Sequence, residues 1–211
     1  MIRFSLFGIP ITVQPFFWLT LVILGGANGA DTRAQILGIG LFVIAGFISI
    51  LVHELGHALT ARRFGAQTHI ALIAFGGYAA YSGVQMTRRQ SFLITAAGPA
   101  IQIALGFAVL LLARALPNLS LYGDHFLGTL IWISFAWAIL NLLPVLPLDG
   151  GRMLESILGP KRIKITLWVT IITAIIAGLA IHEKTGSWVF PIFLGMFAWQ
   201  AFQQLKEENW R

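Results

Sequence analysis

The chain has 211 residues, of which 57% are hydrophobic and only 10% are charged, and its mean hydropathy is +0.82. This composition excludes an ordinary soluble globular domain and is typical of proteins that cross a membrane several times. The sequence contains no cysteine, which excludes disulfides and thiolate chemistry, and no polar stretch is long enough to form its own core. We therefore expect a single membrane-embedded domain over residues 1–211.

The first predicted element covers residues 2–15. Apolar residues alternate on both sides of Gly8, a pattern that predicts a short hairpin or an amphipathic lead-in. The only basic residue in this region is Arg3, and Gly8, Pro10 and Pro15 interrupt any early apolar run. We therefore do not expect a signal peptide here.

Helices long enough to cross a membrane are the main predicted elements, since a spanning helix needs about 20 mostly apolar residues. The sequence predicts an all-α polytopic membrane protein with about six transmembrane helices. The first and last candidates are the weakest, because they are short or rich in aromatic residues. The candidates lie near residues 13–26, 36–61, 91–116, 126–147, 163–182 and 187–204.

The second predicted helix contains the sequence His53-Glu54-Leu55-Gly56-His57. In a helix the two histidines lie one turn apart on one face, with Glu54 beside them. Imidazoles at this spacing can bind Zn²⁺, and the glutamate can take a proton from a metal-bound water. The alternative is a chance match on a core or interfacial helix. Ionisable groups in an apolar span argue against chance, because they need partners there.

Residues 67–84 are apolar, rich in β-branched residues and too short for a span. They predict two short strands around Gly76-Gly77. An open sheet edge cannot face lipid, so this small β element is expected to be re-entrant or interfacial.

A helix-breaking segment, residues 141–152, follows the fourth predicted span and contains Pro144 and Pro147. Irregular backbone at membrane depth lines a cavity or is buried in protein. Hydrolytic zinc sites commonly have three protein ligands, and Asp149 is the carboxylate in this apolar, broken stretch. Two alternatives remain open: Asp149 as a turn or helix-cap residue, and Glu155 as the third ligand. The remaining histidines, at positions 69, 125 and 182, lie near span ends and are expected to be solvated or capping residues.

The net charge of +6 is interpreted as a signal of topology, and no nucleic-acid partner is expected. With six spans, eleven of the Lys and Arg residues fall on one side and three on the other, the three being Arg33, Arg114 and Lys184. The positive-inside rule places the basic side, with both termini, in the cytoplasm. The end of the histidine helix and the segment around Asp149 fall on that same side.

Two motifs together resemble the site-2 protease family of intramembrane zinc metalloproteases. They are the histidine motif in a membrane helix and, about ninety residues later, an Asn-x-x-Pro-x-x-Pro-Leu-Asp-Gly-Gly segment. The resemblance implies that His53, His57 and Asp149 bind one Zn²⁺ per chain. It also implies that Glu54 is the general base and that Asn141 stabilises the oxyanion.

The resemblance extends to the Phe-Gly-Gly sequence after the histidine helix and to Gly98-Pro99 in the next helix, where Gly98 is expected to serve packing. Gln102 stands where many relatives carry an asparagine, so its role is open. The connection from Arg62 to Arg89 is too short for an inserted PDZ-like domain, and about seven residues after the last span are too few for a CBS pair. A minimal form is therefore expected.

The function implied is hydrolysis of peptide bonds in or near transmembrane segments of single-span proteins, in regulated proteolysis or in clearance of signal-peptide remnants. The expected location is the prokaryotic plasma membrane. The strand edge at Gly76 and Gly77 is a candidate for binding an extended substrate. Alternatives are a zinc or cation transporter, which the lack of an inverted repeat disfavours, another type of membrane metallopeptidase, and an inactive scaffold.

Overall fold

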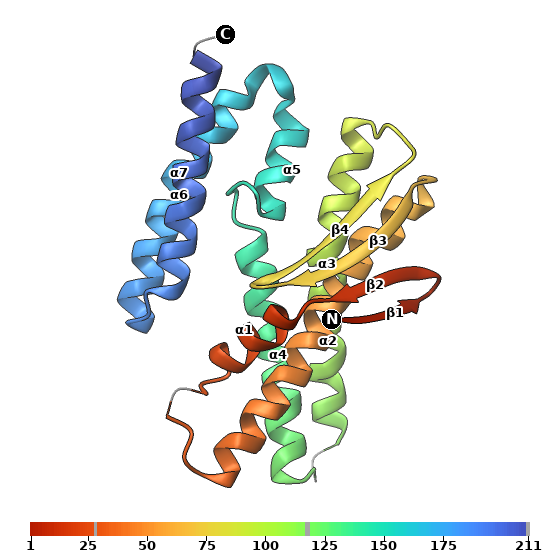
Figure 1. The fold of residues 1–211 in the computed structure, drawn as a ribbon, viewed down its shortest axis with the longest axis vertical. Helices are drawn as coiled ribbons and strands as arrows, with labels where there is room; N and C mark the ends of the chain where they lie inside the picture. The colour runs from red at the N-terminus through yellow and green to blue at the C-terminus, as the bar shows by residue number, and fades with distance from the viewer. Residues whose placement is uncertain (28, 117–118, 210–211) are drawn as a thin grey trace. The chain divides into compact units, whose positions relative to one another are not determined.

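The computed structural model describes residues 1–27, 29–116 and 119–209, and Figure 1 shows its strands and helices. The chain divides into two compact units. The first unit consists of Met1–Gln85 and Ala97–Ala138, and the second consists of Met86–Ala96 and Ile139–Arg211. Two helices, α3 and α4, contribute residues to both units. The prediction of a single domain stays a prediction.

The first unit contains a four-stranded sheet in the order β1-β2-β3-β4. The strands are β1 (Ile2–Leu6), β2 (Ile9–Val13), β3 (Gln67–Ile73) and β4 (Gly76–Ser82). Of the two alternatives for residues 2–15, the hairpin is confirmed. The two strands predicted within residues 67–84 are also present, but their turn lies at Ala74-Phe75, and Gly76 and Gly77 begin β4. Between β1 and β2, Phe7 and Gly8 have positive φ angles of 52° and 74°, as a tight two-residue turn requires. Parallel pairing of β2 with β3 joins the two hairpins into one sheet, an arrangement that the sequence did not predict.

The helices of the first unit are α1 (Pro15–Leu24), α2 (Arg33–Arg63), the later part of α3 (Arg88–Ala115) and most of α4 (Leu121–Asn141). Helix α2 begins at a capping box, in which the Thr32 side chain accepts from the Gln35 backbone and the Gln35 side chain accepts from the Thr32 backbone. Its last turn contains Arg62 and Arg63, which complement the helix dipole.

The sheet packs on the C-terminal half of α2, the half that contains the histidine motif (Figure 1). Buried side chains of β2 and β3 form one core cluster with buried side chains of α2, namely Ile9, Ile11, Val13, Ile70 and Leu72 with Ile50, Leu51, Leu55 and Ala58. Helices α2, α3 and α4 meet in a second cluster around Ala45, Val109, Leu130 and Ile133. The sheet thus covers the half of α2 that contains the motif, whereas this second cluster lies on α2 about two turns before His53.

The second unit contains α5 (Asp149–Leu158), a short 3₁₀ helix (Pro160–Arg162), α6 (Ile163–Thr185) and α7 (Val189–Asn209). Helices α6 and α7 form a hairpin (Figure 1) and pack through Ala174, Leu194 and Ala198. Arg88, at the start of α3, donates from its guanidinium to the backbone carbonyls of Ser156 and Ile157 and so ties α3 to the end of α5.

Among the described residues, four helices are long and apolar enough to cross a membrane: Arg33–Arg63, Arg88–Ala115, Leu121–Asn141 and Pro160–Thr185. The protein is therefore mostly helical and has a small sheet, as predicted, whereas the count of about six spans is not confirmed. Helix α1 is apolar but has only 10 residues, and α7 is not among the four helices.

The predicted fourth span, residues 126–147, differs from the structure at both ends. The helix α4 begins at Leu121 and ends at Asn141. It ends early because Pro144 and Pro147 cannot continue a helix, and a residue that precedes a proline is pushed away from helical angles. Arg211, one of the eleven basic residues in the topology count, lies outside the described residues.

Candidate metal site and catalytic base

The two histidines of the motif lie one turn apart on α2, and both are buried, with 3% of His53 and 8% of His57 exposed. Their Nε2 atoms are 3.0 Å apart. Two nitrogens that bind one tetrahedral zinc at about 2.0–2.1 Å stand about 3.3 Å from each other. The arrangement in the structure therefore fits two ligands of a shared metal ion.

Gln102 of α3 is hydrogen-bonded to Nδ1 of His53, the ring nitrogen that does not face His57. Its Oε1 lies 2.9 Å from His53 Nδ1, and the Gln102 side chain is completely buried. Sequence reasoning left the role of Gln102 open because nothing local in α3 points to α2. The one available signal was its position as a carboxamide in the middle of an apolar helix.

Two glycines let α2 and α3 approach each other at the motif. A Cβ atom at Gly98 would lie 2.2 Å from His57 Nε2, and a Cβ atom at Gly56 would lie 2.6 Å from the Ala97 carbonyl oxygen. Both distances are far below van der Waals contact. Gly98 thus has the packing role that was expected, and the side chain it makes room for is the candidate ligand His57.

Glu54 is buried, with 4% exposed, and lies against β4. A Cβ atom at Gly77 would lie 2.8 Å from Glu54 Cγ and 3.0 Å from Glu54 Oε1, so only glycine leaves room for this carboxylate. Gly76 has a φ of +141° and lies next to Trp137. Strand β4 is the last strand in the order of the sheet. The two predicted substrate-binding glycines therefore lie on an edge strand beside the candidate base.

Asp149 and Asn141 belong to the second unit. Asp149 is the first residue of α5 and is half-buried, and Leu148 occupies the N-cap position. Asp149 is therefore not the capping residue that the alternative reading expected. Asn141 is the last residue of α4. Glu155, the alternative third ligand, is exposed on α5.

The three remaining histidines lie outside the motif. His69 on β3 and His125 on α4 are exposed, and His182 on α6 stacks on Trp188 at a centroid distance of 3.8 Å. His69 packs edge-to-face on Tyr78. None of these environments contradicts the expected solvated or capping role.

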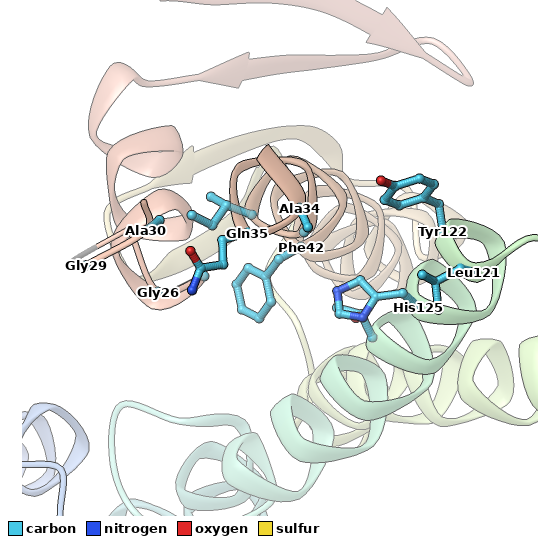
Figure 2. A pocket seen from close by; sticks show the side chains of 13 residues that line it. Gly26, Gly29, Ala30, Ala34, Gln35, Phe42, Leu121, Tyr122 and His125 are labelled. Atoms are coloured by element: carbon cyan, nitrogen blue, oxygen red, sulfur yellow. The ribbon is translucent and has the colours of Figure 1, made fainter. Parts of the chain in front are cut away.

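A separate pocket of about 520 Å³ lies in the first unit where α2 and α4 begin. Figure 2 shows Phe42, Tyr122 and His125 at its wall, and glycines from the α1–α2 connection on the other side. Phe42 precedes His53 by eleven residues, which is about 16 Å along a helix. Among the described residues of its lining, only His125 has an imidazole or carboxylate that could bind zinc, and neither His53 nor His57 lines it, so this pocket is not the candidate metal site.

Known proteins resemble the chain over most of its length. A family model described as Peptidase family M50 matches residues 41–121 and 120–181. A zinc metalloprotease of Methanocaldococcus jannaschii is 31% identical over 159 residues, which is 75% of this chain and 45% of that protein. Stage IV sporulation protein FB of Bacillus subtilis is 26% identical over 205 residues, 92% of this chain and 66% of that protein.

A solved structure has a similar fold. The site-2 protease from Methanocaldococcus jannaschii matches with a TM-score of 0.68 and 25% identity, over 97% of this chain and 94% of that chain. The chain spans about half the length of the first curated relatives it matches. The resemblance to site-2 proteases and the expected class, a zinc-dependent protease, are confirmed at the level of the family. The chain belongs to peptidase family M50.

Proposed function

We propose that the chain is an intramembrane zinc endopeptidase. The observation that carries this proposal is the buried pair of histidines, with Nε2 atoms 3.0 Å apart and Glu54 beside them, on a helix apolar enough to cross a membrane. Membership of a peptidase family supports it. A transporter would also need ligands inside the membrane, but nothing observed in the described residues favours one.

The proposed metal ligands are His53, His57 and Asp149, which together hold one Zn²⁺. The donor set, two imidazoles and a carboxylate, is typical of hydrolytic zinc sites, which keep a fourth position open. When bound, zinc lowers the pKa of a coordinated water toward about 7 and polarises a carbonyl.

Two residues of the chain are proposed to act in catalysis, Glu54 in proton transfer and Asn141 in stabilising negative charge. The Glu54 carboxylate accepts the proton of the attacking water and returns it to the nitrogen of the leaving amine. The Asn141 side-chain amide donates a hydrogen bond to the carbonyl oxygen as negative charge develops on it. Removal of one such donor lowers kcat by about 10²–10³-fold.

The proposed substrates are single-span membrane proteins, including regulators cleaved in the membrane or remnants of signal peptides. A helical peptide bond is protected, because its carbonyl is already hydrogen-bonded within the helix. The substrate must therefore unwind, and we propose that it pairs with the edge strand β4 near Gly76 and Gly77. Main-chain pairing makes little demand on substrate side chains.

The proposed location is the prokaryotic plasma membrane, with both termini and the active-site side cytoplasmic. The eleven-to-three asymmetry of basic residues supports this orientation. Within the described parts of the chain, four helices are long and apolar enough to span a bilayer, which supports insertion into a membrane.

The decisive experiment compares the native chain with Glu54→Gln in a cleavage assay on a single-span fusion protein. Glutamine has nearly the same shape but cannot accept the proton, so cleavage should fall by at least about 10²-fold. Zinc content and thermal unfolding should stay as in the native chain. Cleavage by Glu54→Gln at the native rate would remove Glu54 from the mechanism, and zinc uptake into sealed vesicles without cleavage would favour the transporter.

A further inference from the structure

A row of buried polar side chains connects three helices of the first unit and ends on His53. Its members are Ser49 of α2, Gln102 of α3 and Ser134 of α4, and none of the three has any exposed surface. Buried polar groups are retained only where hydrogen bonds satisfy them. A continuous row of them beside a candidate metal ligand therefore requires an explanation beyond packing.

The hydrogen bonds of the row form a chain. Gln102 Oε1 lies 2.9 Å from His53 Nδ1. Gln102 Nε2 donates to Ser49 Oγ at 2.8 Å and lies 3.4 Å from the Ser49 backbone carbonyl oxygen. Ser49 Oγ lies 3.1 Å from Ser134 Oγ. Gln102 thus bridges α3 to α2, and Ser134 extends the row to α4.

The Ser49 carbonyl fixes which way the Gln102 amide points. A backbone carbonyl can only accept, so the amide atom beside it must be the NH₂ group. If the amide were reversed, its oxygen would face the carbonyl oxygen and two acceptors would repel. The Gln102 oxygen therefore faces His53.

The direction of the amide in turn fixes the tautomer of His53. Because Gln102 Oε1 is an acceptor, His53 Nδ1 must carry the proton and donate it. The lone pair of the neutral ring is then on Nε2, the atom that lies 3.0 Å from His57 Nε2. The ring has the tautomer that a metal ligand needs before any metal arrives.

We propose that Gln102 is a positioning residue, which holds His53 in the Nδ1–H tautomer and aims its Nε2 at the metal, and that Ser49 anchors the Gln102 amide. The inference rests on the proposed function, because it assumes that His53 binds a metal. In zinc-bound histidines the N–H group of the second ring nitrogen typically donates a hydrogen bond to a carboxylate, a carbonyl or water. A neutral carboxamide performs this task without adding a charge to an apolar span.

The first test is made on the native chain, and a variant serves only to assign its signals. ¹⁵N NMR of the full native chain in lipid or detergent, stripped of metal and held at alkaline pH, reports which ring nitrogen of His53 carries the proton. The signals that disappear in His53→Gln are those of His53, which distinguishes them from the signals of the four other histidines. A predominant Nδ1–H form is expected. A predominant Nε2–H form would overturn the proposal, whether or not the protein later binds zinc.

The second test measures zinc affinity by competition with a chromophoric chelator. Gln102→Leu should weaken zinc binding by about 10–100-fold, the usual effect of losing such a partner, and should mix the two His53 tautomers. Gln102→Glu keeps an acceptor for His53 Nδ1 but loses the donor to the Ser49 carbonyl, so its zinc affinity should lie between those of Gln102→Leu and the native chain. Ser134→Ala, at the far end of the row, leaves the bond to His53 intact and serves as the control for disturbed packing.

Three outcomes decide the matter. Unchanged affinity and an unchanged tautomer in Gln102→Leu would refute the positioning role. An equal loss in Gln102→Leu and Ser134→Ala would show a purely structural role. If the native chain binds no zinc, the proposed function fails, while the tautomer of His53 in the native chain still decides the inference.

Discussion

The sharpest perturbation that the structure offers is Gly98→Ala, which adds one methyl group beside a candidate zinc ligand. The new Cβ atom would lie 2.2 Å from His57 Nε2. Ordinary van der Waals contact begins at 3.4 Å, so the ring or α3 has to move by about 1.2 Å. Zinc sites tolerate deviations of only about 0.2 Å in ligand distances. We therefore expect strong loss of bound zinc.

Gly106→Ala is the matched control for overpacking. Gly106 lies on the same helix, in the same unit, and its added Cβ atom would lie 2.9 Å from the Phe135 ring, away from the histidines. Overpacking of this kind costs about 1–3 kcal/mol of stability. Both variants should therefore unfold at a lower temperature than the native chain.

The two variants should differ in metal and activity. Elemental analysis should find zinc retained in Gly106→Ala and depleted in Gly98→Ala, and cleavage by Gly98→Ala should fall by about 10²-fold or more, as for other misplacements of about 1 Å. Full zinc content and native cleavage in Gly98→Ala would refute the placement of His57 against α3.

Three further predictions concern the remaining elements. Asp149→Ala should lose most bound zinc while Glu155→Ala keeps it, and the reverse result by elemental analysis would transfer the third ligand to Glu155. Adjacent N–H groups of an edge strand point alternately into the sheet and away from it. Ala79→Pro and Ala80→Pro each remove one N–H group, so the variant that loses the inward N–H should destabilise the hairpin. The variant that loses the outward N–H should stay folded and keep its zinc, but should no longer cleave a membrane substrate. Equal cleavage by both variants would refute the proposed strand pairing. Because the chain has no cysteine, a single Lys161→Cys reports topology cleanly, and its labelling from outside intact cells would invert the proposed orientation.

Local patterns in the sequence predicted the local elements of the fold. The turn at Gly8 and the alternation around it predicted the first hairpin. The glycines at 76 and 77 predicted two strands, although the turn between them lies two residues earlier, at Ala74-Phe75. The parallel pairing of the two hairpins could not be predicted in this way. It brings Ile11 opposite Ile70, and no local pattern encodes a pairing between residues so far apart in the chain.

The candidate site shows the same division between local and non-local information. The helical spacing of His53 and His57 follows from the sequence alone, because residues four apart share a helix face. The contact of Gln102 with His53 depends on how closely α3 packs on α2. That closeness is set by Gly56 and Gly98, whose missing side chains carry no chemical signal in a sequence. A polar residue in an apolar helix indicates that a partner exists, but only the packing shows which residue it is.

Glycine at position 77 connects the fold to the proposed chemistry. Because a hydrogen atom replaces a side chain there, the backbone of β4 lies directly against the Glu54 carboxylate. A peptide added to this edge would lie one strand spacing, about 4.7–4.9 Å, from Gly77. Larger residues at 77 would displace the base and the strand together. Position 77 therefore requires glycine whether β4 binds substrate or only covers the motif. The proline variants of β4 distinguish these two roles, because they change backbone amides and leave Gly77 in place.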